Sequence, residues 1–348
     1  MKFDPQRLAP ARATADELVQ RGTYGSIVIA VGDARQTQWT HVVPGPDQAT
    51  LKTVYRIASV TKPIVALAVM QLVEQGQILL NDPVVRFIPE FGQQGKDGVT
   101  VWHLLTHTSG LAVDDAQFRP LFHQRAPRDA YLALICASPV DFAPGTRSEY
   151  CNPAFPVLGE LIRRVSGEDY PDYLRTRIFA PLHMTDTAFA PTDATRAAPL
   201  RGDETQADVD YFNSLAAPQG GLWSTAGGLL ALGQTMLSGG RRGEYRLLHP
   251  ITIETMTRLH TPGLMSHMNG PQPVYRALGW GKRGPTGVLL ASEPSYGHGG
   301  ATGALLWIAP LHDLVYVFLG NPMTDDPDIG RQRDAIRVMN TVYAALVT

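Results

Sequence analysis

Residues 54–76 read VYRIASVTKPIVALAVMQLVEQG, and this stretch decides the fold. Its first part, Val54–Ala58, predicts a short strand. From Ser59 onward the apolar residues recur with the period of a helix, which we expect to run to Gln75 and to end at Gly76. Ser59 therefore lies where a strand gives way to a long apolar helix.

This junction places a serine and a lysine next to each other. Residues three apart share a helix face, so the Lys62 amine can reach the Ser59 hydroxyl. Free backbone N–H groups and the partial positive charge of a helix start favour an alkoxide, and a desolvated lysine can act as a base. The alternative reading is an N-cap serine followed by a solvated lysine. The position just before an apolar helix favours the catalytic reading.

Strand patterns lie at both ends of the chain, and helix patterns fill its middle. The other expected strands are Ser26–Val31, Thr37–Val43, Val288–Ala291, Ala304–Ala309 and Leu314–Leu319. The other expected helices are 8–21, Val101–Leu105, Pro153–Ser166, Pro171–Ile178, Ser224–Ser238 and Asp328–Leu346. The simplest packing joins both chain ends in one antiparallel sheet flanked by helices. This predicts an α+β fold with a sheet domain from residues 1–75 and 271–348, a mostly helical domain from 76–270, and a site in the cleft between them.

Composition narrows the possible partners. The chain has 348 residues, enough for about two domains. Its net charge is −2 and it has no run of basic residues, so we expect no nucleic-acid partner. No stretch reaches the roughly 18 consecutive apolar residues of a membrane span. Asp4, Gln6 and Arg7 interrupt any signal-like segment, which predicts a cytoplasmic protein, although a secreted chain trimmed of its signal would look the same.

The chain has two cysteines, Cys136 and Cys151, which are too few to stabilise a fold of this size through disulfides. No Cys/His spacing is typical of a zinc site. We expect both to be small buried residues, with a disulfide between them as the alternative. The sequence predicts neither a metal nor a cofactor.

A second segment with chemical potential is Tyr150-Cys151-Asn152, which follows a Pro-Gly turn and precedes a helix. Side chains two apart on an extended segment point the same way, so Tyr150 and Asn152 would face one cleft. A phenol near an ammonium group loses its proton more easily and can relay one, and an asparagine amide can hold a substrate carbonyl. The plainer reading makes Asn152 a helix cap.

A third segment, Tyr296–Gly303, is rich in glycine and leads into the strand expected at Ala304. Its glycines would let a substrate lie close to the backbone, and the Ala301 N–H could donate to an oxyanion. A phosphate-binding loop is disfavoured because an apolar strand follows instead of a helix. His298 in this segment is a candidate site residue, although a lone histidine is more often structural.

In this order and spacing, the three segments resemble the penicillin-recognising serine hydrolases, which include class C β-lactamases, D-alanyl-D-alanine carboxypeptidases, D-aminopeptidases and β-lactamase-like esterases. The family's signatures S-x-x-K, Y-x-N and K/H-x-G are matched by Ser59–Lys62, Tyr150–Asn152 and His298–Gly300. Residues 55–58, 104–111 and 220–226 also look like the family. The resemblance extends from about residue 10 to residue 345.

The resemblance implies a β-lactamase/transpeptidase-like fold and an acyl-enzyme mechanism. Ser59 would attack a carbonyl, while Lys62 and Tyr150 would carry the proton to the leaving group. The N–H groups of Ser59 and Ala301 would hold the oxyanion, and His298 would close the site. Asn152 and the segment Gly299–Ala301 would contact the substrate.

Two departures from the family pattern bear on the substrate. His298 stands where class C β-lactamases carry lysine. Gly299 stands where peptidases and β-lactamases usually offer a hydroxyl that helps to hold a substrate carboxylate. Three cations could replace that hydroxyl as an anion-binding group, although the plainer reading makes them exposed surface residues: Arg276, Lys282 and Arg283.

These features favour a β-lactamase-like carboxylesterase acting on a small ester or amide. The first alternative is a D-amino-acid peptidase or amidase, or a D-alanyl-D-alanine carboxypeptidase, with weak β-lactamase activity. The second is a non-catalytic binding protein of the same fold, which the three intact motifs disfavour.

Overall fold

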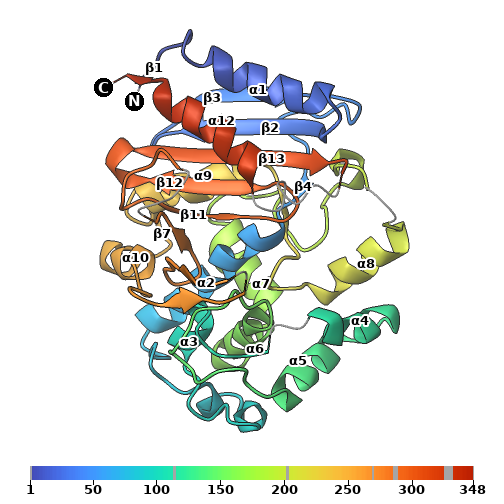
Figure 1. Cartoon of the computed structure of the whole chain (residues 1–348), viewed down its shortest axis with the longest axis vertical. Coiled ribbons are helices and arrows are strands. Elements are labelled where there is room, and N and C mark those ends of the chain that lie inside the picture. The colour runs from blue at the N-terminus through green and yellow to red at the C-terminus, as the bar shows by residue number, and fades with distance from the viewer. Residues whose placement is uncertain are drawn as a thin grey trace.

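The computed structural model of the protein describes residues 2–112, 115–200, 204–268, 270–284, 289–324 and 332–347. Its largest sheet has six antiparallel strands in the order β10-β11-β12-β13-β2-β3 (Figure 1). Strands from the N-terminal and C-terminal parts of the chain therefore pair directly, at β2 with β13. The predicted α+β architecture, an antiparallel sheet built from both chain ends and flanked by helices, is confirmed.

The strands of the six-stranded sheet are β2 (Tyr24–Gly32), β3 (Thr37–Val43), β10 (Gly281–Lys282), β11 (Tyr296–Gly299), β12 (Leu305–Ala309) and β13 (Leu314–Pro322). Four two-stranded ribbons are formed by β1 (Lys2–Phe3) with β14 (Leu346–Val347), β4 (Tyr55–Arg56) with β5 (Trp223–Ser224), β6 (Arg241–Arg242) with β7 (Tyr245–Arg246), and β8 (Met265–Ser266) with β9 (Gln272–Pro273). The α-helices are α1 (Ala9–Gln20), α2 (Thr61–Glu74), α3 (Val101–Leu105), α4 (Asp115–His123), α5 (Arg128–Ala137), α6 (Ala154–Ser166), α7 (Tyr170–Leu174), α8 (Gln206–Leu215), α9 (Ala226–Leu237), α10 (Pro250–Thr257) and α12 (Arg333–Ala344).

The central strands are buried on both faces because helices cover the sheet twice. On β13, Val315 and Val317 face one core, whereas Leu314 and Tyr316 face the other. Helices α1 and α12 pack together over the second face, and α9 packs against β2 and β13 on the first (Figure 1). This explains why β13 reads as a continuous apolar run instead of an alternating one.

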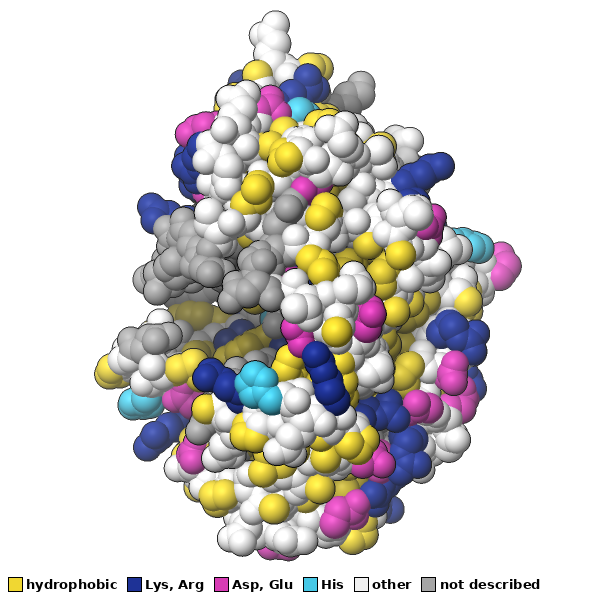
Figure 2. All heavy atoms as spheres, turned by 90° about the vertical axis from the view of Figure 1, so that its right-hand side faces the viewer, with side chains coloured by type: hydrophobic (Ala, Val, Ile, Leu, Met, Phe, Trp, Pro, Cys, Tyr) yellow, Lys and Arg dark blue, Asp and Glu magenta, His cyan; other side chains and the backbone are white. Residues whose placement is uncertain are grey.

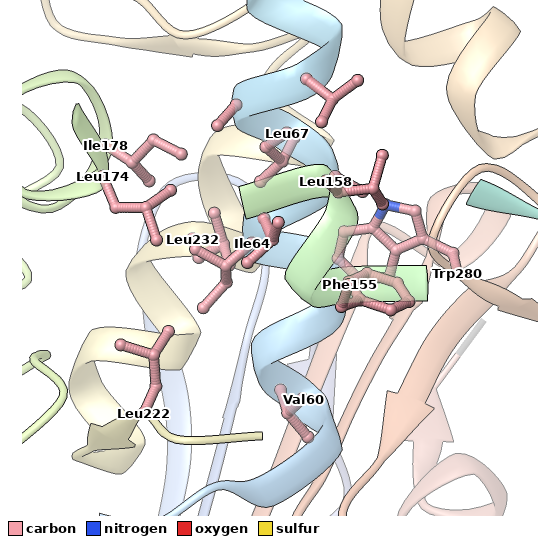
Figure 3. Packing of buried hydrophobic residues seen from close by; sticks show 14 of the residues in the cluster. Val60, Ile64, Leu67, Phe155, Leu158, Leu174, Ile178, Leu222, Leu232 and Trp280 are labelled. Carbon is pink, nitrogen blue, oxygen red and sulfur yellow. The ribbon is translucent and has the colours of Figure 1, made fainter. Parts of the chain in front are cut away.

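Helix α2 is mostly apolar and is buried on all sides from Thr61 to Leu72, as expected for a helix surrounded by protein. Figure 3 shows Ile64 and Leu67 of this helix among side chains from several other elements. These neighbours include Phe155 and Leu158 of α6 and Leu232 of α9. Because α2 is held on all sides, the position of its first turn is fixed by the core.

The structure corrects several expected element boundaries. The strand predicted at Val54–Ala58 is only Tyr55–Arg56, and it pairs with β5 outside the main sheet. Residues 289–291 form no strand, and Val288 lies outside the described residues. The first half of the glycine-rich third segment is the strand β11, paired with β12 at His298 and Leu306. Of the expected closing helix, residues 333–344 are helical, and its predicted start at Asp328 lies outside the described residues.

The expectation for the cysteines is confirmed, since Cys136 and Cys151 are both free and buried. In the part of the chain that the structure describes, each helix is too short or too polar to cross a lipid bilayer. On the face shown in Figure 2, basic and acidic side chains lie interspersed. The division into domains 1–75 with 271–348, and 76–270, stays a prediction.

The contact between α9 and the sheet gives a stability prediction. A Cβ at Gly233 would lie 2.4 Å from Val315 Cγ1 on β13, so Gly233→Ala should lower the free energy of unfolding by about 1–3 kcal/mol despite the higher helix propensity of alanine. Gly227 in the same helix is exposed and has room for a Cβ, so Gly227→Ala should be neutral or slightly stabilising. Urea unfolding of both variants tests this, and equal effects would contradict the close packing.

Candidate active site

Lys62 and Ser59 are joined by a hydrogen bond at the start of α2. The Lys62 Nζ atom donates to Ser59 Oγ over 3.0 Å and to the backbone carbonyl of Gln219 over 2.6 Å. Lys62 has no exposed surface, and its Nζ lies 4.8 Å from the centre of the Tyr150 ring. The alternative of an N-cap serine and a solvated lysine is therefore wrong: the N-cap of α2 is Val60, and no side chain caps it.

The backbone just before Ser59 is strained. Ala58 has φ of 44°, in the left-handed region that costs a non-glycine residue of order 1 kcal/mol or more. Its neighbour Ile57 is held from two sides, by a hydrogen bond from its N–H to Leu222 O over 2.9 Å and by close approach of Gly300. A Cβ at Gly300 would lie 2.3 Å from Ile57 O, so this contact requires glycine. The third segment is thereby held directly beside the nucleophile candidate.

Tyr150 is positioned by a residue to which the sequence analysis assigned no role, His107. The two rings stack with centroids 4.7 Å apart, and His107 Nδ1 accepts a hydrogen bond from the Cys151 N–H over 3.0 Å. Burial, aided by the charges of Arg276 and Lys62, holds the pKa of His107 well below its usual value. A neutral His107 can therefore accept this bond permanently. The sequence feature that could have identified His107 is the segment 104–111, which contains it and resembles the family.

His298 is a neutral histidine buried in β11. Burial, with a smaller contribution from the Lys62 charge, lowers the pKa of His298 to about 3. Its Nδ1–H donates to the carbonyl of Gly299 over 2.7 Å, which leaves Nε2 as an acceptor. The Nε2 atom is buried and has no hydrogen-bond partner among the described residues. This atom can accept a hydrogen bond from a bound molecule.

A cavity of about 350 Å³ brings most of the predicted site residues together. Its lining includes Ser59, Tyr150, His298, Gly299 and Ala301. Asn152 instead lines a second cavity, whose lining also includes Gln219. The helix-cap reading of Asn152 is not what the structure shows, because the N-cap of α6 is Pro153 and α6 has no side-chain cap.

Arg276 also faces this cavity, whereas Lys282 and Arg283 are tied elsewhere. The Arg276 guanidinium lies 5.5 Å from the centre of the Tyr150 ring, and its Nε is buried without a hydrogen-bond partner among the described residues. Burial lowers the pKa of Arg276, but an arginine stays charged at neutral pH. Lys282 donates to Pro294 O and Arg283 to Leu289 O. All three are half-buried, so their reading as exposed cations is wrong.

Gln332, which the sequence analysis did not single out, occupies the space beside Gly299. A Cβ at Gly299 would lie 2.2 Å from Gln332 Cδ, and Gln332 Nε2 donates to Gly300 O over 3.3 Å. A side chain at position 299 would therefore displace this glutamine. The amide of Gln332 lies where a residue at 299 with a hydroxyl would place its side chain. The sequence carried no signal for this contact, since the two residues are far apart along the chain.

The sequence of the chain is similar to a known family and to named relatives. The sequence model of the family described as "Beta-lactamase" matches residues 11–340. A protein of Salmonella agona, provisionally named a D-alanyl-D-alanine carboxypeptidase, is 28% identical over 334 residues, which cover 84% of this chain and 74% of that protein.

Two solved structures share the fold. A penicillin-binding protein homologue from Caulobacter crescentus has a TM-score of 0.79 and 23% identity, with 99% of each chain covered. A family VIII carboxylesterase has a TM-score of 0.78 and 19% identity, also with 99% of each chain covered. At these identities the two structures establish the architecture alone.

The buried neutral His298 predicts how stability depends on pH. Its pKa is near 3 in the folded protein and about 6.5 when unfolded, so the unfolded state binds the extra proton as the pH falls below about 6.5. The free energy of unfolding therefore decreases as the pH falls from about 6.5 toward 3. Between pH 7 and pH 4.5 the wild type should lose about 2 kcal/mol more unfolding free energy than His298→Gln. Urea unfolding at both pH values measures this, and an equal loss in both proteins would show that His298 is not held neutral.

Proposed function

The chain belongs to the β-lactamase family of serine hydrolases, and from that premise we propose that it is a carboxylesterase that hydrolyses small esters or amides through an acyl-enzyme on Ser59. The observation that carries the proposal is the 3.0 Å hydrogen bond between Lys62 Nζ and Ser59 Oγ at the wall of a cavity. A nucleophile within hydrogen-bond reach of a buried amine is the arrangement that acyl transfer needs.

The proposed reaction has two steps. Ser59 Oγ attacks the carbonyl carbon, and Lys62 and Tyr150 take its proton and pass it to the leaving alcohol or amine. The backbone N–H groups of Ser59 and Ala301 stabilise the tetrahedral oxyanion. Water then attacks the acyl-enzyme with the same groups carrying its proton, and the carboxylic acid leaves with Ser59 restored. The proposal requires no metal and no cofactor.

His298 fits this scheme as a neutral residue. His298 and Tyr150 line the same cavity with their ring centroids 6.1 Å apart, and the His298 Nε2 atom has no hydrogen-bond partner among the described residues. A lysine here, as in class C β-lactamases, would add a second buried cation beside Lys62. A neutral imidazole instead supplies an acceptor, which suits a substrate or water that arrives with a proton to donate.

The preference for esters rests on Gly299 and Gln332. A hydroxyl at 299 is missing, and the Gln332 amide fills the space beside the strand. An uncharged ester needs no carboxylate contact from this position. The structural likeness to a family VIII carboxylesterase supports the same choice as an analogy of fold.

A second candidate function is favoured by Arg276. Its half-buried guanidinium beside Tyr150 is the kind of group that holds a carboxylate, as a D-amino-acid peptidase or D-alanyl-D-alanine carboxypeptidase would need. The provisional name of the Salmonella relative points the same way. In this reading Arg276 would bind the substrate carboxylate, which Gly299 has no side chain to hold.

A substrate panel separates the two functions: short p-nitrophenyl esters, D-Ala p-nitroanilide and nitrocefin. We expect kcat/KM for the esters to exceed that for nitrocefin by at least about tenfold, the equivalent of one missing neutral hydrogen bond. The double variant Gly299→Thr/Gln332→Ala supplies a hydroxyl and removes the side chain that occupies its space. It should raise kcat/KM for nitrocefin and so reduce the ratio between esters and nitrocefin. Gln332→Ala alone is the control.

Faster hydrolysis of D-Ala p-nitroanilide or nitrocefin than of esters would contradict the esterase proposal. The peptidase would then take its place, and Arg276→Gln should abolish that activity while leaving ester hydrolysis largely intact.

A further inference from the structure

A second cavity, of about 310 Å³, lies within the helical part of the molecule. Side chains from α4, α5 and α8 form much of its wall, and residues of α6, Tyr170 and the segment 217–219 form the rest. Four charged residues are part of this lining: Arg119, Arg128, Asp129 and Glu160. We call it the aromatic pocket. Its characteristic residues are Phe118, Phe122, Tyr131, Leu132, Phe212 and Leu215.

The walls of the aromatic pocket are fixed before any ligand binds. The rings of Phe118 and Tyr131 stack in nearly parallel planes, 10° apart. The Tyr131 hydroxyl is hydrogen-bonded to the Tyr211 hydroxyl over 2.9 Å, and Tyr211 in turn donates to Ala126 O over 2.7 Å. Because the hydroxyl of Tyr131 is tied in this way, its ring is presented as an apolar wall. Preformed apolar walls with few polar groups are typical of small-molecule sites.

One wall of the aromatic pocket adjoins the proposed catalytic groups. Gln219 lines the pocket, and its backbone carbonyl accepts the hydrogen bond from Lys62 Nζ. Asn152, which also lines the pocket, stands two residues after Tyr150. The side-chain Oε1 of Gln219 is buried and has no hydrogen-bond partner among the described residues. This oxygen can accept a hydrogen bond from a bound molecule.

We propose that the aromatic pocket binds the acyl part of the substrate, and that this part ends in a bulky uncharged group such as a phenyl ring. The proposal rests on the acyl-enzyme function above. Ser59 lines the first cavity, and the aromatic pocket begins at Asn152 and Gln219. The acyl chain and the leaving group extend from the carbonyl carbon in different directions, so we assign them to different cavities. The cavity with Arg276 and His298 is the more polar, so it receives the leaving group. The aromatic pocket receives the apolar acyl tail.

The proposal is tested with p-nitrophenyl acetate and p-nitrophenyl 3-phenylpropionate, which share a leaving group and differ only in the acyl part. In the wild type, kcat/KM should be at least about tenfold higher for the phenylpropionate, since burial of its phenyl ring removes apolar surface from water that the acetyl methyl group does not have. Leu132→Trp, which fills the pocket, should reduce this ratio to about twofold or less, with acetate hydrolysis nearly unchanged.

Leu237→Trp is the matched control. Leu237 is also a half-buried leucine on a helix, but it lines neither cavity, so this variant should keep the wild-type ratio. Phe118→Ala provides a second test that adds no bulk: removal of one aromatic wall should lower kcat/KM for the phenylpropionate and spare the acetate.

A ratio near one in the wild type, or a loss of both activities in equal proportion in Leu132→Trp and Phe118→Ala, would overturn the assignment of the aromatic pocket while leaving the esterase function standing. Failure of the wild type to hydrolyse either ester would overturn the proposed function itself, and the acyl pocket with it.

Discussion

The burial of the Lys62 ammonium is the constraint on which the rest of the site depends. A charged amine without exposed surface is costly unless its donors are satisfied. Ser59 Oγ and the Gln219 carbonyl accept from it, and the Tyr150 ring lies near it. These partners come from three distant parts of the chain. The same interactions that offset the cost of burial therefore bring together the proposed nucleophile, its proton-handling partner and the Gln219 backbone at the edge of the aromatic pocket.

The fold holds this arrangement rigidly. Helix α2 is surrounded by protein, so its first turn cannot move without disturbing the core (Figure 3). The strained Ala58 turns the chain sharply before Ser59, and Gly300 brings β11 against the backbone of Ile57. The His107 ring stacks against Tyr150, and its neutral Nδ1 accepts a hydrogen bond from the Cys151 N–H, so both contacts hold Tyr150 in place. A site built in this way is preorganised, which is what stabilisation of a transition-state charge requires.

Much of this was predictable from sequence because the signals were local. The period-2 and period-3.6 patterns predicted β3 and α3 with their observed bounds, and S-x-x-K spacing brought Ser59 and Lys62 together. Contacts between distant residues had no such signal. The pairing of β4 with β5, the guanidinium of Arg276 beside Tyr150, and Gln332 against Gly299 each depend on the tertiary fold. The sequence pattern does not predict strand β11 because glycine has low strand propensity, but its pairing with β12 outweighs that preference.

The central claim is that Ser59, activated by Lys62, is the nucleophile. The most direct measurement is to treat the protein with a fluorophosphonate probe and to locate the covalent adduct by peptide mass spectrometry, with Lys62→Arg treated alongside. Arginine keeps the positive charge but does not deprotonate near neutral pH. The account predicts a single adduct on Ser59 in the wild type and labelling at least about a hundredfold slower in Lys62→Arg. An adduct on any other residue, or equal labelling rates in the two proteins, would contradict it.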